Sequence, residues 1–122
     1  MTAAATMKVH GIDASYYTVK DLAKATEFYN GLLGMEPTMH AEGFVSEWTF
    51  PGGETFGLYR TENASQSGGV MFSVDDVKAF VDAAKARGVK FDGDGELTDT
   101  PVCHMAFGND NEGNGFIIHH RK

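Results

Sequence analysis

The stretch Val-Lys-Asp-Leu at residues 19–22 opens an amphipathic run that ends at Gly34, and Val-Asp-Asp-Val at residues 74–77 opens a second run that ends at Gly88. Each run starts at aspartate, which caps helix N-termini, and stops at glycine, which adopts the left-handed conformation common at helix C-termini. Between these ends, apolar residues recur at helical spacing. The sequence therefore predicts one supersecondary unit used twice, and a duplicated unit tends to hold a ligand between its copies.

Short strand-like segments surround both predicted helices. They are rich in β-branched and aromatic residues and are separated by glycine-containing turns. They cover residues 9–19, 35–40, 44–50 and 55–60 in the first half, and residues 69–74, 89–91, 102–107 and 116–120 in the second. Each half reads β-α-β-β-β, and runs of strands after each helix favour a largely antiparallel α+β fold.

The chain length predicts a single domain. At 122 residues with 42% hydrophobic content, it can build one core but not two independent ones, so the halves must share that core. The polar residues 62–68 mark a linker between module one, residues 8–61, and module two, residues 69–122. Residues 1–7 are interpreted as a flexible tail.

Charge and cysteine content exclude several classes of protein. Lys and Arg number 10 against 17 Asp and Glu, and the resulting net charge of -7 opposes nucleic-acid binding. A single cysteine, Cys103, excludes an internal disulfide and fits a reducing compartment. No apolar run is long enough to span a bilayer, and residues 1–6 lack the pattern of a signal peptide. We expect a soluble, cytoplasmic protein with no membrane partner.

Three segments carry a resemblance to a known family. Residues 19–34, 72–77 and 109–116 together resemble the vicinal oxygen chelate (VOC) superfamily, which includes glyoxalase I, bleomycin-resistance proteins and extradiol dioxygenases. The likeness covers nearly the whole chain after residue 7. It implies paired βαβββ modules whose strands form a cupped, mostly antiparallel sheet around a cavity, commonly in a homodimer.

The resemblance also locates the family's metal site. In metal-dependent members, four inward positions on the first and last strands of the modules supply His and Glu ligands. The corresponding positions here are Ala14, Gly57, Gly69 and Ile117, none of which can ligate a metal, and only His119 lies close by as a conventional ligand. Three side chains are the usual minimum for catalytic zinc. We therefore expect no cofactor, with a divalent metal as the less favoured alternative.

Two histidines near the C-terminus are candidate catalytic or binding residues. If the last hairpin pairs around Asn111 and Glu112, His104 lies opposite His119 and both share the side of Ile117. Facing imidazoles could bind a metal, act as acid and base, or hydrogen-bond a ligand. Two partly exposed histidines at the rim of a sheet are the structural alternative.

Small residues at the four central positions leave room for an organic ligand. Tyr16 shares the predicted cavity face, and Trp48 and Phe50 reach it if Gly52 and Gly53 form a two-residue turn; with a longer turn, Glu47 and Thr49 point inward instead. The glycines could equally reflect crowding or a bulge, and the aromatic residues could belong to the core. The predicted ligand-binding residues are Tyr16, Trp48, Phe50, Gly57, Gly69, His104, Ile117 and His119.

Acidic residues near the expected cavity rims favour a cationic ligand, although a solvated acidic surface explains them as well. They are Glu42, Glu47, Glu54, Asp92, Asp94 and Glu96. The leading hypothesis is a metal-independent protein that sequesters a drug or metabolite, aromatic or cationic in character, as bleomycin-resistance proteins do. The alternative is a glyoxalase-like isomerase, lyase or epimerase with His104 and His119 in a non-standard site. A surface interaction module is a third possibility.

Overall fold

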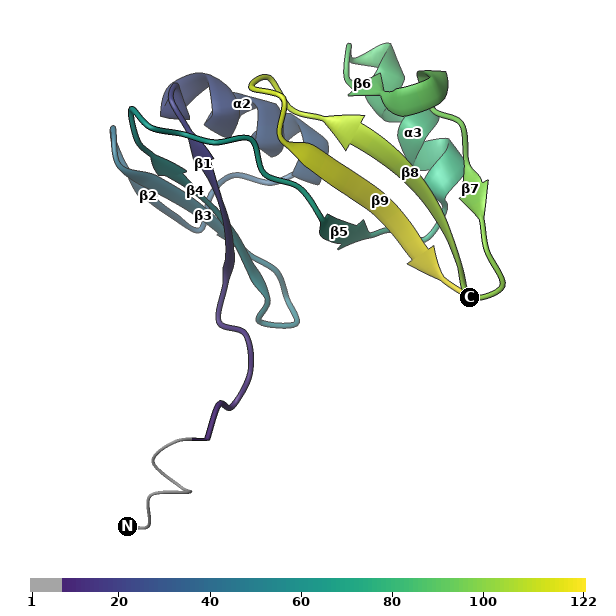
Figure 1. The fold of residues 1–122 in the computed structure, drawn as a ribbon, viewed down its shortest axis with the longest axis horizontal. Helices are drawn as coiled ribbons and strands as arrows, with labels where there is room; N and C mark the ends of the chain where they lie inside the picture. The colour runs from purple at the N-terminus through teal and green to yellow at the C-terminus, as the bar shows by residue number, and fades with distance from the viewer. Residues whose placement is uncertain (1–7) are drawn as a thin grey trace.

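The computed structural model describes residues 8–122, so the predicted tail at residues 1–7 lies outside the described part. The first module comprises β1 (Ser15–Val19), α2 (Leu22–Leu33), β2 (Met39–Ala41), β3 (Val45–Thr49) and β4 (Thr55–Arg60). The second comprises β5 (Val70–Ser73), α3 (Val77–Ala86), β6 (Lys90–Phe91), a 3-10 turn η1 (Asp92–Asp94), β7 (Thr98–Asp99), β8 (Cys103–Asn109) and β9 (Gly115–Arg121). Figure 1 shows the two modules side by side, joined by the segment between β4 and β5 that contains the predicted linker.

Both helices begin and end as their sequences predict. The Asp21 carboxylate accepts a hydrogen bond from the Lys24 amide at 3.0 Å, and Gly34 ends α2 with a φ of 70°. In α3, Asp76 is the capping residue, and its carboxylate accepts from the Ala79 amide at 3.0 Å. Neither helix could cross a membrane, because no helix within residues 8–122 has the required length and apolar character.

The strands form two mixed sheets, ordered β1-β4-β3-β2 and β5-β9-β8-β6, with β7 also paired to β8. The β1–β4 and β5–β9 pairs are parallel, and the other pairs are antiparallel. The α+β class and the VOC-type modules are thus confirmed. No hydrogen-bonded ladder joins the two sheets within the described chain, and β1 and β5 each lie at an edge.

One core serves both modules. The ring of Tyr29, on α2, lies 4.9 Å from the ring of Phe56 in the first module. The same ring lies 6.4 Å from Phe72 and 6.5 Å from Phe116 in the second module, measured between ring centroids. These rings are almost fully buried. The prediction of a shared core is therefore confirmed, and the modules are packed through the helix-facing sides of their sheets.

A buried polar cluster connects the turn between β8 and β9 to α2. The Tyr29 hydroxyl and the Asn114 side-chain amide each donate to Asp110 Oδ2 at 2.9 Å. Burial, reinforced by the neighbouring Asp110 carboxylate, raises the pKa of Tyr29 well above its ordinary value. Nearby, the Glu112 carboxylate accepts from the Lys20 and Asp21 amides at 2.7 and 2.8 Å. The turn thus holds the modules together through charge-assisted hydrogen bonds.

Candidate functional site

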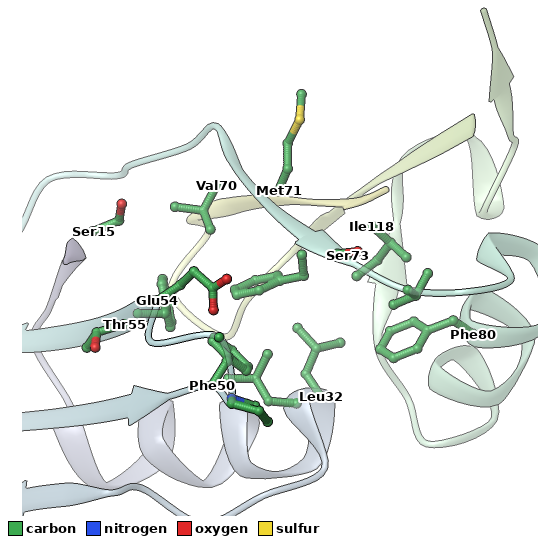
Figure 2. Close-up of a pocket in the computed structure, with 16 residues that line it drawn as sticks. Ser15, Leu32, Phe50, Glu54, Thr55, Val70, Met71, Ser73, Phe80 and Ile118 are labelled. Carbon is green, nitrogen blue, oxygen red and sulfur yellow. The ribbon is translucent and has the colours of Figure 1, made fainter. Parts of the chain in front are cut away.

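A cleft of about 510 Å³ opens between the two modules. Its walls are the end of α2, the turn between β3 and β4, strand β5 and the first turns of α3, as Figure 2 shows. The cleft is on the helix-facing side of the sheets, where the shared core reaches the surface. Its apolar lining includes Leu32, Phe50, Phe56, Val70, Phe72 and Phe80.

Polar groups are few and lie at the rim of this cleft. They are the hydroxyls of Ser15, Thr55 and Ser73 and the carboxylate of Glu54. In Figure 2 the Glu54 carboxylate points from the turn toward the interior. It lies directly over Gly52, where an added Cβ would be 2.5 Å from the Glu54 Oε1 atom. An apolar cavity with a few polar groups at its edge is the usual form of a small-molecule site.

Phe50 is the one predicted ligand-binding residue that lines the cleft. The other lining residues were not predicted, because the cleft is formed by the packing of the two modules against each other. One signal was present: Phe50 and Pro51 place apolar side chains beside a turn, where solvated residues are more usual. Glu54 was singled out as a rim residue, and it is the only one of the six acidic candidates that lines this cleft.

The space expected at Gly57 is filled by Tyr16. These residues are paired between β1 and β4, and a Cβ on Gly57 would lie 2.7 Å from the Tyr16 ring. The Tyr16 hydroxyl donates to the Glu47 carboxylate on the same face. Crowding explains this glycine, and Gly69 has a backbone reason of its own, a φ of 98°. Gly57 therefore creates no open space, whereas a Cβ on Gly69 would meet nothing within 4 Å.

Trp48 is buried rather than directed to the predicted cavity face. The turn after β3 is the longer of the two predicted forms, closed by the Phe50 amide donating to the Glu54 carbonyl at 2.9 Å. Glu47 therefore shares the face of its partner Gly57, and Thr49 lies two residues further along that face. Trp48 is fully buried and donates through Nε1 to the Asn30 side chain on α2 at 3.0 Å. Trp48 therefore does not reach the face on which its ligand contact was predicted.

The predicted facing pair of histidines is also wrong. His104 is paired with His120, whereas His119 is paired with Met105. The turn keeps three residues between Asp110 and Asn114, one more than the predicted pairing allows, and a shift of one residue moves a side chain to the other face. His104 Nε2 instead lies 3.1 Å from the Asp99 carboxylate. His119 stays on the face of Ile117, as predicted.

The four positions of the family's metal site do not fit a metal. Ala14 precedes β1, the Gly57 position is covered by Tyr16, and Ile117 lies between Met71 and Phe107 on neighbouring strands. Across residues 8–122, no three His, Cys, Asp or Glu side chains converge in a way that could hold an ion. The residues present at these positions therefore offer no oxygen or nitrogen donor set.

Comparison with known proteins gives a family match and similar solved structures. Residues 11–118 match the family model of the Glyoxalase/Bleomycin resistance protein/Dioxygenase superfamily. No curated protein matches the sequence. The antibiotic binding protein TnmS3 from Streptomyces sp. CB03234 is 21% identical, with a TM-score of 0.76 over 95% of this chain and 99% of its own.

Two further structures have the same fold. A lactoylglutathione lyase from Agrobacterium tumefaciens is 20% identical, with a TM-score of 0.70 over 92% of this chain and 94% of its own. A glyoxalase/bleomycin resistance protein from Catenulispora acidiphila DSM 44928 is 21% identical, with a TM-score of 0.71 over 88% and 95%. At such identities the likeness establishes the fold alone. Because the family match extends over nearly all of the described residues, the chain belongs to the Glyoxalase/Bleomycin resistance protein/Dioxygenase superfamily.

Proposed function

We propose that this protein binds a small organic molecule in the cleft between its modules and sequesters it without a metal. The observation that carries the proposal is the cleft itself, because about 510 Å³ of largely apolar space falls in the range of known ligand sites. The absence of ligating side chains at Ala14, Gly57, Gly69 and Ile117 supports the metal-independent form. The similar fold of a structure described as an antibiotic binding protein is consistent with this role.

Catalysis by His104 and His119 acting together is a weaker alternative. The two imidazoles belong to opposite faces of the β8–β9 hairpin, so they cannot share a substrate on one face. His119 alone remains beside Ile117 as a possible proton donor or acceptor. No second group of matched chemistry accompanies it, since its cross-strand neighbours are Ser73 and Met105.

The proposal includes association of two chains in the cytoplasm. Within residues 8–122, no strand is paired with the outer edge of β1 or β5, and free edges favour pairing with another chain. Large apolar side chains on the open faces of the sheets are 36–52% exposed, namely Tyr16, Met39, Tyr59, Met71 and Phe107. Light scattering tests this point: a mass near that of the single 13.2 kDa chain would contradict a dimer. The single cysteine supports a reducing compartment.

Ligand binding in the cleft is tested by calorimetric titration of metal-free protein with aromatic compounds. Ser73→Trp places an indole at the rim of the cleft and should abolish binding, whereas the control Val102→Trp, at a position 65% exposed and outside the cleft, should not. Binding that survives Ser73→Trp would contradict the assignment of the cleft. Binding that needs an added divalent metal would contradict the metal-independent form.

A further inference from the structure

The lining of the apolar cleft contains a single carboxylate, at its rim. Glu54 is the only ionisable side chain among the residues that line it, and Lys, Arg and His are absent from that lining. No hydrogen-bond donor or cation of the described chain contacts the Glu54 carboxylate. Glu54 is exposed, so a cation beside it would form an ion pair of the weak, solvent-screened kind.

Several acidic residues elsewhere on the molecule have partners within the described residues. Glu47 accepts from Tyr16, and Glu62 forms an ion pair with Arg60. Asp94 is paired with Lys85 at 3.1 Å, and Asp99 with Lys122 at 2.7 Å. The low pKa of Asp99, caused first by its hydrogen bond from Lys122, reflects that pairing. Glu54 differs from these residues in being unpartnered and in pointing into a cavity.

The surroundings of Glu54 match a ligand with two distinct ends. Phe50, Val70 and Phe72 provide apolar walls for a ring or alkyl body. At the rim, Ser15 and Ser73 add hydroxyl oxygens whose side chains make no hydrogen bond within the described residues. An ammonium group carries three donors and can use a carboxylate together with hydroxyl acceptors.

We infer that the cleft selects an organic cation, a molecule with an apolar body and one positively charged nitrogen, and that Glu54 determines this specificity. The inference rests on the proposed function, because it names the class of ligand that the same cleft takes. The acidic surface, with a net charge of -7, adds a general attraction for cations. Glu54 adds the local discrimination between a cation and a neutral molecule of the same shape.

The test uses three naphthalene compounds that carry one small substituent of different charge at the same ring position. These are 2-naphthylmethylamine, which is cationic at neutral pH, 2-naphthylmethanol, which is neutral, and 2-naphthoate, which is anionic. Each is titrated by calorimetry into the wild-type protein, Glu54→Gln and Glu96→Gln. Glu96 is exposed and outside the cleft, so Glu96→Gln removes the same charge as a matched control.

We expect the amine to bind wild type most tightly and the naphthoate most weakly. Glu54→Gln should weaken amine binding about three- to fivefold, the size of an exposed ion pair, and leave alcohol binding unchanged. Glu96→Gln should change neither by as much. The preference for the amine should shrink when salt rises from about 20 mM to about 500 mM, because exposed charges are screened.

Three results would overturn the inference, and they are distinguishable. If amine and alcohol bind wild type equally and Ser73→Trp blocks both, the cleft binds ligands but Glu54 sets no charge preference. If none of the three compounds binds, the proposed function of the cleft fails together with the ligand class. Equal losses of amine affinity in Glu54→Gln and Glu96→Gln would assign the preference to overall charge instead of Glu54.

Discussion

Replacing Tyr29 by phenylalanine removes one hydroxyl from the buried polar cluster that joins the modules. The ring stays, so its contacts with Phe56, Phe72 and Phe116 are retained. What disappears is the hydrogen bond to Asp110 Oδ2 at 2.9 Å, between a fully buried side chain and a carboxylate residue that is 7% exposed. The variant therefore isolates the contribution of this hydrogen bond to the free energy of unfolding.

The expected loss is about 2 kcal/mol. A hydrogen bond to a charged group contributes about 1.5–3 kcal/mol. The lower half of that range applies because Asn114 still donates to the same oxygen at 2.9 Å, so Asp110 keeps a partner. With an unfolding entropy of about 2.1 cal/mol/K per residue, the chain should lose about 8 °C in melting temperature.

Calorimetric melting at pH 7 measures this loss. Protein concentration must be held constant, because association raises the apparent stability of a dimer. Tyr59→Phe is the matched control, since Tyr59 is 40% exposed and its hydroxyl makes no hydrogen bond within the described chain. It should change stability by less than about 0.5 kcal/mol. Equal stability of the two variants would refute the assigned role of Tyr29.

Three further predictions follow from burial and capping. The folded-state pKa of Tyr29 is raised, so above pH 10.0 the unfolded chain loses a proton that the folded chain keeps. The free energy of unfolding should therefore be unaffected by Tyr29 below that pH and should fall above it by about 1.4 kcal/mol per pH unit. Tyr17, whose pKa is also raised, acts in the same direction. A urea midpoint that stays constant up to pH 11 would contradict this prediction. Asp76→Ala should cost about 1 kcal/mol in urea unfolding through loss of the α3 cap, and Asp75→Ala should cost much less; similar losses would show that the cap is misassigned. Trp48, the only tryptophan, should resist iodide quenching until the protein unfolds, and strong quenching of the folded protein would contradict its burial.

Local chemistry made the elements of this fold predictable. Both helices start at an aspartate cap and run through apolar residues spaced for one face, and these signals depend only on neighbouring residues. Residue spacing therefore predicts the modules and their order along the chain.

Register and tertiary packing could not be predicted in the same way. Strand side chains alternate with a period of two, so one extra residue in the turn from Asp110 to Asn114 was enough to place His104 and His119 on opposite faces. The cleft depends on how α2 and the β3–β4 turn approach β5. No local pattern determines that approach, and for this reason most of its lining was missed.

The turn that carries Asp110 and Glu112 has a consequence for how the chain reaches its folded state. Its contacts join Tyr29 of α2 to a residue 81 positions later and Lys20, just before α2, to one 92 positions later. During synthesis the first helix therefore emerges long before the residues that complete its surroundings. Such distant contacts slow folding and make it cooperative over the whole chain. The duplicated halves resemble separate units in sequence, but the first half cannot reach its final packing until the turn that carries Asp110 and Glu112 has been synthesised.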